Sequence, residues 1–306
     1  MRIVFAGTPE VALPSLEALA AAGNEVLAVV TRPDAPAGRG KRLKPSPVAR
    51  WGLDHGVEVL RPVRPRDDDF VARLGELAPD VCPVVAYGAI IPDHVLAIPE
   101  HGWVNLHFSL LPAWRGAAPA QRALIAGESV VGATTFAIVR ELDAGPVYRR
   151  WSTEVETDEV AGDLLARLAT QSAHLLVDTL ADIDAGVVPE PQPTTGITVA
   201  PKITVDEARL DWARSASELA NLVRGTSPSP GAWTTFAGER FKVLLARPVG
   251  ETTLSPGELR ASRRDLRMGT GDGDLDLVTV QAVGKRPMSG AEWARGIRLV
   301  DGVRCE

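Results

Sequence analysis

The chain has 306 residues, which is longer than one typical domain, and this length predicts two medium-sized domains ahead of one large domain. Hydrophobic residues make up 45% and charged residues 24% of the sequence, a balance typical of a soluble globular protein that excludes a disordered chain, a collagen-like repeat and a disulfide scaffold. The formal net charge of −6 argues against a non-specific nucleic-acid binder, so any RNA contact has to come from local basic patches.

The N-terminus begins with a short apolar run, Ile3 to Ala6, which is too short for the hydrophobic region of a secretory signal. No other apolar stretch approaches the length of a membrane-spanning helix, and a cytoplasmic location is therefore expected. The two cysteines, Cys82 and Cys305, are far apart and form no metal-ligand or CxxC pattern. The sequence thus gives no signal for a metal site.

The first ninety residues alternate short runs of β-forming residues with helical stretches, which is the pattern of a parallel α/β sheet. The turn after the first strand, GTPE, lacks the GxGxxG pattern of a dinucleotide site. We therefore expect a Rossmann-like domain with a mainly parallel sheet. The predicted strands are 3–6, 26–30, 57–60 and 81–86, and the predicted helices are 11–22 and 70–77.

A basic segment follows the second predicted strand. Between Arg32 and Arg50, six lysine or arginine residues stand against one acid, Asp34, on a stretch rich in Pro and Gly. This composition favours a mobile loop that a phosphate backbone orders on contact, although most charge runs are solvated surface. The candidate RNA contacts in this segment are Arg39, Lys41, Arg42 and Lys44.

The pattern changes near residue 188. Up to that point we predict further strands at 103–106 and 132–139, an antiparallel return at 147–156 and a helix at 160–180. The tract PEPQPTTG then indicates a linker, and beyond it a helix at 216–224 precedes β-rich runs at 233–236, 241–245 and 275–282. The predicted division is an α/β domain at 1–188, a linker at 189–204 and a small OB-like β-barrel at 205–306.

The segment GWVNLHFSLLPAWRGAAPAQRAL, residues 102–124, carries the strongest chemical signal. In an extended VNLH, the side chains of Asn105 and His107 point to the same face, because side chains alternate along a strand. An apolar loop follows, which places the pair at the carboxyl end of a strand, where ligands bind in open α/β sheets. Taken alone, a histidine beside a strand is more often structural, and Asp143 in ELDAGPV is more often a turn former.

The run NLHFSLLPAWRGAAPAQ resembles the signature of the folate-dependent formyltransferases. In that family Asn-x-His-x-Ser-Leu-Leu-Pro is followed downstream by an Asp in a Leu-Asp-x-Gly motif, which here is ELDAGPV with Asp143. The runs FAGTPE, RPDAPAGRGKRLKPSPV, VVAYGAIIP and GKRPMS resemble the methionyl-tRNA branch of the family. Phe108 stands where the family usually has Gly, and ELDAGPV departs from the commoner GLDTGD wording, whereas Asn105, His107 and Gly145 are retained.

This resemblance implies transfer of a formyl group from 10-formyltetrahydrofolate to the amino group of initiator methionyl-tRNA, without a metal. It implies Asn105, His107 and Asp143 as catalytic residues and a C-terminal domain that binds tRNA, where Lys285 and Arg286 are further candidate contacts. A monomer is expected. The folate pterin is expected to lie against two segments, whose residues are Ser109, Leu110, Leu111 and Pro112 in the first and Val85, Tyr87, Gly88 and Ile90 in the second.

The chemistry of the reaction agrees with these residue types. Formyl transfer to an amine passes through a tetrahedral oxyanion, so a donor such as the Asn105 amide has to face the formyl oxygen. The attacking nitrogen loses a proton and the leaving N10 gains one, and His107, with an ordinary pKa of about 6.5, can serve either transfer near neutral pH. Asp143 can hold the tautomer of His107 and stabilise its imidazolium.

Two other functions compete with this one. A formyltransferase acting on a sugar amine or on glycinamide ribonucleotide, or a hydrolase of the same folate, would need neither the basic loop nor the C-terminal domain. A non-catalytic nucleotide- or RNA-binding protein would have no need for a proton shuttle beside an oxyanion donor. Both alternatives therefore explain less of the sequence.

Overall fold

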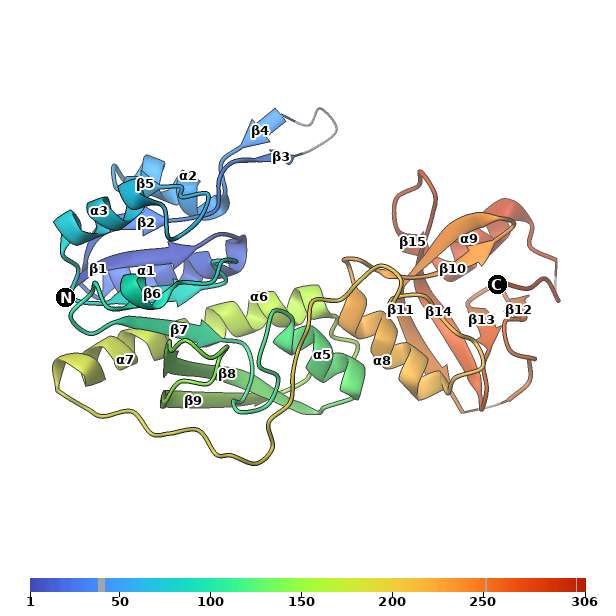
Figure 1. The fold of residues 1–306 in the computed structure, drawn as a ribbon. Helices are drawn as coiled ribbons and strands as arrows, with labels where there is room; N and C mark the ends of the chain where they lie inside the picture. Colours follow the sequence, from blue (N-terminus) through green and yellow to red (C-terminus); the bar gives the residue numbers. More distant parts are fainter. Residues whose placement is uncertain (38–41, 251, 301) are drawn as a thin grey trace. The chain divides into compact units, whose positions relative to one another are not determined.

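A computed structural model describes residues 1–37, 42–250, 252–300 and 302–306 and divides the chain into two compact units (Figure 1). The first unit consists of Met1–Gly116, Gly132–Thr153 and Leu165–Val199, and the second consists of Ala117–Val131, Glu154–Leu164 and Ala200–Glu306. Residues 189–199 of the predicted linker thus belong to the first unit by their contacts. The functional division at 188 and 205 stays a prediction.

The first unit is built on a seven-stranded sheet in the order β5-β2-β1-β6-β7-β8-β9. The pairs β5-β2, β2-β1, β1-β6 and β6-β7 are parallel, and β8 runs antiparallel to β7. This order confirms the predicted Rossmann-like, mainly parallel sheet. The strands are β1 (Arg2–Gly7), β2 (Glu25–Val30), β5 (Glu58–Leu60), β6 (Cys82–Val85), β7 (Trp103–His107), β8 (Val130–Ala137) and β9 (Val147–Glu154).

Helices cover both faces of this sheet. Val4 and Ala6 of β1 pack in one cluster with Phe70 of α3 (Asp68–Leu77) and Val95 of α4 (Asp93–Leu96). Alternate residues of β1 face the other side, where α1 (Leu13–Ala21) contacts α2 (Pro47–Asp54) and α7 (Ala173–Asp184). A short 3-10 helix, η1 (Glu10–Ala12), precedes α1. Burial on both faces explains the continuous apolar runs of the inner strands.

Two local predictions differ from the structure. The segment between Arg32 and Arg50 contains a hairpin of β3 (Ala35–Ala37) and β4 (Arg42–Lys44), and then α2, whose N-cap Ser46 accepts a hydrogen bond from the Ala49 amide. The helix predicted at 160–180 is two helices, α6 (Ala161–Gln171) and α7. Ser172 lies between them, and its hydroxyl donates to the Leu168 carbonyl at 2.6 Å, a bond that competes with regular helix.

The second unit contains an antiparallel sheet in the order β10-β11-β14-β13-β12, with β15 paired to β14. In the described part of the chain β10 and β12 do not pair directly with each other, so the strand pairing shows an antiparallel sheet and no closure of the predicted OB-like β-barrel. The C-terminal residues bond to both edges, Glu306 to Thr235 and Val303 to Leu259. The strands are β10 (Ala232–Phe236), β11 (Glu239–Val249), β12 (Leu259–Ala261), β13 (Leu266–Gly269), β14 (Asp274–Ala282) and β15 (Met288–Ser289).

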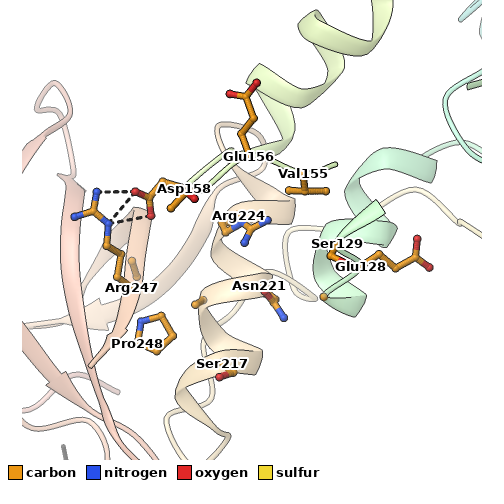
Figure 2. Close-up of a pocket in the computed structure, with 14 residues that line it drawn as sticks. Glu128, Ser129, Val155, Glu156, Asp158, Ser217, Asn221, Arg224, Arg247 and Pro248 are labelled. Atoms are coloured by element: carbon orange, nitrogen blue, oxygen red, sulfur yellow. Dashed lines mark hydrogen bonds and ion pairs between the residues drawn. The ribbon is translucent and has the colours of Figure 1, made fainter. Parts of the chain in front are cut away.

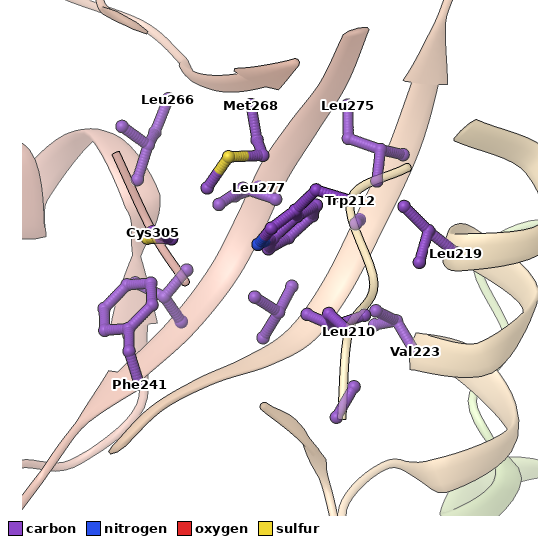
Figure 3. Close-up of a cluster of buried hydrophobic side chains, with 14 of the residues drawn as sticks. Leu210, Trp212, Leu219, Val223, Phe241, Leu266, Met268, Leu275, Leu277 and Cys305 are labelled. Atoms are coloured by element: carbon purple, nitrogen blue, oxygen red, sulfur yellow. The ribbon is translucent and has the colours of Figure 1, made fainter. Parts of the chain in front are cut away.

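Trp212 lies in the core of the second unit, among Met268, Leu275 and Leu277 (Figure 3). Its indole nitrogen donates to the Thr234 hydroxyl at 3.1 Å, so burial leaves no polar atom of the ring unpaired. The helices of this unit are α5 (Pro119–Ala126), α8 (Ala216–Thr226) and α9 (Gly290–Ile297). The sequence pattern predicts α8 but not α9, although a Ser-x-x-Glu capping box marks the start of α9.

Candidate active site

Asn105 and His107 lie in β7, and the two predicted folate segments follow the carboxyl ends of the parallel strands β6 and β7. His107 is the last residue of β7, and the register that pairs Val84 of β6 with Asn105 of β7 places His107 level with the residue that follows β6. The segments 85–90 and 109–112 therefore leave the sheet at the same edge. This is the edge where open α/β sheets bind ligands.

His107 and Asp143 come together at this edge. The His107 Nδ1 atom lies 3.8 Å from Asp143 Oδ2, and their side chains are 6% and 13% exposed, respectively. The same Oδ2 atom accepts a hydrogen bond of 2.7 Å from the Gly116 amide. Burial lowers the pKa of His107 below its ordinary value, whereas the Asp143 carboxylate and the Trp114 carbonyl act in the opposite direction.

The tautomer of His107 is set by the backbone carbonyl of Trp114. His107 Nε2 lies 2.8 Å from the Trp114 carbonyl oxygen, which can only accept a hydrogen bond, so Nε2 carries the proton. The Nδ1 atom of the neutral ring is then free of a proton and faces Asp143. The Trp114 carbonyl therefore sets the tautomer that Asp143 was expected to hold, and stabilisation of the imidazolium by Asp143 stays a prediction.

Asn105 lies on the same face of β7 as His107 and is half-buried. Its side chain makes no hydrogen bond to another residue in the part of the chain that the structure describes. An amide in this setting can donate to an oxygen of a bound molecule. The geometry therefore fits the predicted oxyanion donor, whose role stays a prediction.

The first predicted folate segment, Ser109, Leu110, Leu111 and Pro112, is anchored to the sheet through its own backbone. The Thr134 hydroxyl donates to the Ser109 carbonyl at 2.7 Å and accepts from the Leu111 amide at 3.2 Å. Arg150 Nε donates to the Leu111 carbonyl at 3.1 Å. These bonds occupy backbone groups of the segment against which the pterin is expected to lie, so fewer of them are left for a ligand.

The second predicted folate segment is more open. Val85 and Tyr87 are buried, while Gly88 is exposed and Ile90 is 83% exposed. A large apolar side chain that is exposed in a segment leaving the ligand-binding edge of the sheet is the kind of surface that a flat heteroaromatic ligand covers. The folate contacts in both segments stay a prediction.

The predicted RNA contacts lie in two places. Arg39 and Lys41 are outside the described residues, Arg42 begins β4, and Lys44 is exposed. In the second unit, Lys285 and Arg286 are exposed in the turn between β14 and β15.

Sequence reasoning missed a second basic group in the same unit. The guanidinium groups of Arg209 and Arg240 lie 5.7 and 4.2 Å from the centroid of the Trp233 ring. Both arginines are exposed, and the Trp233 indole nitrogen is fixed on the Val205 carbonyl at 2.7 Å. Sequence periodicity could not reveal this stack, because Arg209 precedes α8 by several residues and meets β10 and β11 only in the folded unit.

The second unit also contains a cavity of 390 Å³ between α8, β11 and the loops at 127–129 and 155–158 (Figure 2). Arg247 lines it, but its guanidinium binds both oxygens of Asp158 at 2.7 to 3.0 Å. None of the predicted site residues lines this cavity. Across the described ranges, no group of three or more His, Cys, Asp or Glu side chains could hold a metal ion, and no helix is long and apolar enough to cross a membrane.

The fold is an open, mainly parallel α/β sheet, and the buried His107–Asp143 pair lies at the edge where such sheets bind ligands. Residues 1–180 match the family described as formyl transferase, and residues 202–298 match the formyl transferase C-terminal domain. The chain belongs to the formyl transferase family.

Two relatives in that family are similar over nearly their whole length. The methionyl-tRNA formyltransferase of Streptomyces avermitilis is 55% identical over 305 residues, which are 99% of this chain and 98% of that protein. The methionyl-tRNA formyltransferase of Thermobifida fusca is 54% identical over 306 residues, or 99% of each chain.

Solved structures show the same fold at low identity. HypX from Aquifex aeolicus in complex with tetrahydrofolic acid has a TM-score of 0.68 at 20% identity, covering 96% of this chain and 47% of that chain. WlaRD, a sugar 3N-formyl transferase, has a TM-score of 0.68 at 14% identity, covering 94% of this chain and 99% of that chain.

Proposed function

We propose that this chain transfers the formyl group of 10-formyltetrahydrofolate to the amino group of methionyl initiator tRNA, with His107 moving the proton. The observation that carries the proposal is the buried His107–Asp143 pair, in which Nε2 is fixed on the Trp114 carbonyl and Nδ1 faces the carboxylate. The names of the relatives that are 54 to 55% identical over nearly the whole chain support the choice of substrate.

The residues divide the chemistry between them. The folate supplies the formyl group on its N10 atom. The Asn105 amide donates to the formyl oxygen, where negative charge develops as the amine attacks. The attacking nitrogen loses a proton, and His107 accepts that proton on its Nδ1 atom. The Asp143 carboxylate, 3.8 Å from Nδ1, stabilises the imidazolium, which then gives the proton to N10 as the bond between N10 and the formyl carbon breaks.

The Trp114 contact allows His107 to accept and return the proton at a single ring atom, Nδ1. Because Nε2 stays bound to a carbonyl, the imidazole gains and returns its proton at Nδ1 without rotating. The lowered pKa of His107 keeps the ring neutral at the start of the reaction near neutral pH. The ring is therefore ready to act as a base before it acts as an acid.

Sugar formyl transfer is the strongest alternative. WlaRD aligns with 94% of this chain, so a C-terminal domain by itself does not exclude a small substrate, contrary to the sequence argument. The features that favour tRNA are the basic segment with Arg39, Lys41, Arg42 and Lys44 and the exposed Lys285 and Arg286. We include in the proposal a monomeric, cytoplasmic protein with a catalytic domain at 1–188 and a tRNA-binding domain at 205–306.

The test is formylation by the purified chain. The protein is incubated with 10-formyltetrahydrofolate and methionyl initiator tRNA, and formyl-methionine is measured after release from the tRNA. Methionyl elongator tRNA and a nucleotide-linked amino sugar are the comparison substrates. We expect formyl-methionine from the initiator tRNA, and a preference for the amino sugar would overturn the proposed substrate.

A triple variant tests the RNA-binding role of the basic segment. Replacing Arg39, Lys41 and Arg42 with Ala is expected to raise the KM for tRNA and to flatten its salt dependence by roughly one logarithmic slope unit for each phosphate that the variant no longer binds. The KM for the folate should stay unchanged. An unchanged KM for tRNA at moderate salt would show that the segment is solvated surface.

A further inference from the structure

Residues 190–199, which we call the strap, run beside the candidate active site. At one end, Glu190 exchanges two backbone hydrogen bonds of 2.7 and 2.8 Å with Val147, the first residue of β9. At the other end, Thr198 accepts from the Trp114 amide through its hydroxyl at 2.8 Å and from the Arg115 amide through its carbonyl at 2.9 Å. The strap is therefore fastened at both of its ends, and one end binds the residues that follow the Trp114 carbonyl contact to His107.

The side chain of Gln192 points from the strap into this region. Its Nε2 atom donates to the carbonyl oxygens of Asp143 and Gly145, each at 2.8 Å. Its Oε1 atom accepts from Arg115 Nε and Nη2 at 3.2 and 2.7 Å. Carbonyls only accept and a guanidinium only donates, so the orientation of the amide is fixed by its partners.

The two loops that Gln192 joins hold the two members of the catalytic pair. On one side is Asp143, whose φ of +49° is a left-handed conformation that the surroundings have to maintain. On the other side is Arg115, which lies between the carbonyl of Trp114 that fixes His107 and the amide of Gly116 that binds the Asp143 carboxylate. One amide side chain thus spans both supports.

We propose that Gln192 is a positioning residue for formyl transfer, because its amide holds the Asp143 loop against residues 114–116 and so sets the distance between the Asp143 carboxylate and His107. The proposal rests on the function proposed above. Displacement of a catalytic group by about 1 Å can lower a rate by about 10². The strap therefore belongs to the catalytic machinery as well as connecting the two matched family domains.

Gln192→Glu is the sharpest variant. It keeps the volume and an acceptor for Arg115, but it loses both donors to Asp143 and Gly145. We expect kcat to fall about 10- to 100-fold while the KM values for folate and tRNA stay within about twofold. Gln192→Ala should lose as much or more, and Thr195→Ala, which removes an exposed hydroxyl of the same strap, should keep the kcat of the wild type.

A second measurement does not depend on activity. The pKa of His107 is followed by NMR of its imidazole protons in the wild type and the three variants. When the Asp143 carboxylate is no longer held near Nδ1, the pKa of His107 should fall below that of the wild type, because the carboxylate raises it. A merely structural role would lower the midpoint of thermal unfolding and leave the His107 titration where it is.

The outcomes separate the two proposals. If the wild type forms no formyl-methionine but Gln192→Glu still lowers the pKa of His107, positioning by Gln192 is supported and the proposed function fails. If the wild type is active and Gln192→Glu keeps both its kcat within twofold and the His107 titration of the wild type, positioning by Gln192 is overturned.

Discussion

The Asp143→Asn substitution tests the proposed mechanism at a single charge. Asparagine has the shape of aspartate, tolerates the left-handed backbone at this position and keeps an oxygen that accepts from the Gly116 amide. The fold of the loop should therefore be preserved. What the variant loses is the negative charge 3.8 Å from His107 Nδ1.

The size of the effect follows from this distance. Two unit charges at this separation interact by about 4 kcal/mol at an effective dielectric constant of about 20. Both side chains are largely buried, so solvent screens their charges only weakly. The Gly116 amide donates a hydrogen bond to the same carboxylate oxygen, which weakens the attraction between that oxygen and the imidazolium. We expect kcat to fall about 10²- to 10³-fold.

The pH dependence of kcat/KM should change in one direction in this variant. Burial lowers the pKa of His107 and the Asp143 charge opposes this effect, so the variant should have a still lower His107 pKa. The reaction begins with neutral His107, and the acidic limb of the kcat/KM profile should therefore move to lower pH in Asp143→Asn. A kcat within tenfold of the wild type, or an acidic limb that moves to higher pH, would refute the role given to Asp143.

Three further predictions concern other positions. His107→Ala should lower the single-turnover rate of formyl transfer by about 10² or more. Gly225→Ala should lower the midpoint of thermal unfolding, because the added Cβ would lie 2.7 Å from the Gln121 carbonyl. Gly75→Ala, at a position with open space around it, should raise the midpoint, because alanine stabilises the interior of helix α3 by about 0.5–1 kcal/mol relative to glycine. Asp182→Asn, which breaks a partly exposed pair with Arg149, should lower the unfolding free energy by about 0.5–1 kcal/mol at pH 7. Because the pair lowers the pKa of Asp182, this loss should begin to shrink as the pH falls below about 4 and should vanish once the pH is below the lowered pKa.

The sheet of the first unit could be predicted because its inner strands are buried on both faces. Runs such as Ile3 to Ala6 and Val81 to Ala86 are apolar at every position, and this pattern persists whatever the loops do. Short elements such as the β3–β4 hairpin were missed, since three-residue strands carry no periodic signal. The OB-like β-barrel was predicted from a β-rich pattern, and such a pattern does not show whether the edge strands pair with each other.

The candidate site likewise contains residues that strand periodicity predicts and residues that only loop geometry brings together. Asn105 and His107 could be placed together because two residues along one strand share a face. The Trp114 carbonyl that sets the His107 tautomer could not be foreseen, since it depends on a left-handed residue in an irregular loop. Gln192 is separated from Asp143 by 49 residues, and a glutamine between two prolines carries no sequence signal for its partners.

The structure explains why the Leu-Asp-x-Gly motif ends in glycine. A Cβ at Gly145 would overlap the Ala137 carbonyl, so only glycine fits at this position, where the loop passes over the end of β8. On the other side of the loop, the Gln192 amide binds the carbonyls of Asp143 and Gly145. The loop is therefore held by β8 and by the strap, and this double restraint keeps the Asp143 carboxylate beside His107 despite a backbone conformation that costs energy to maintain.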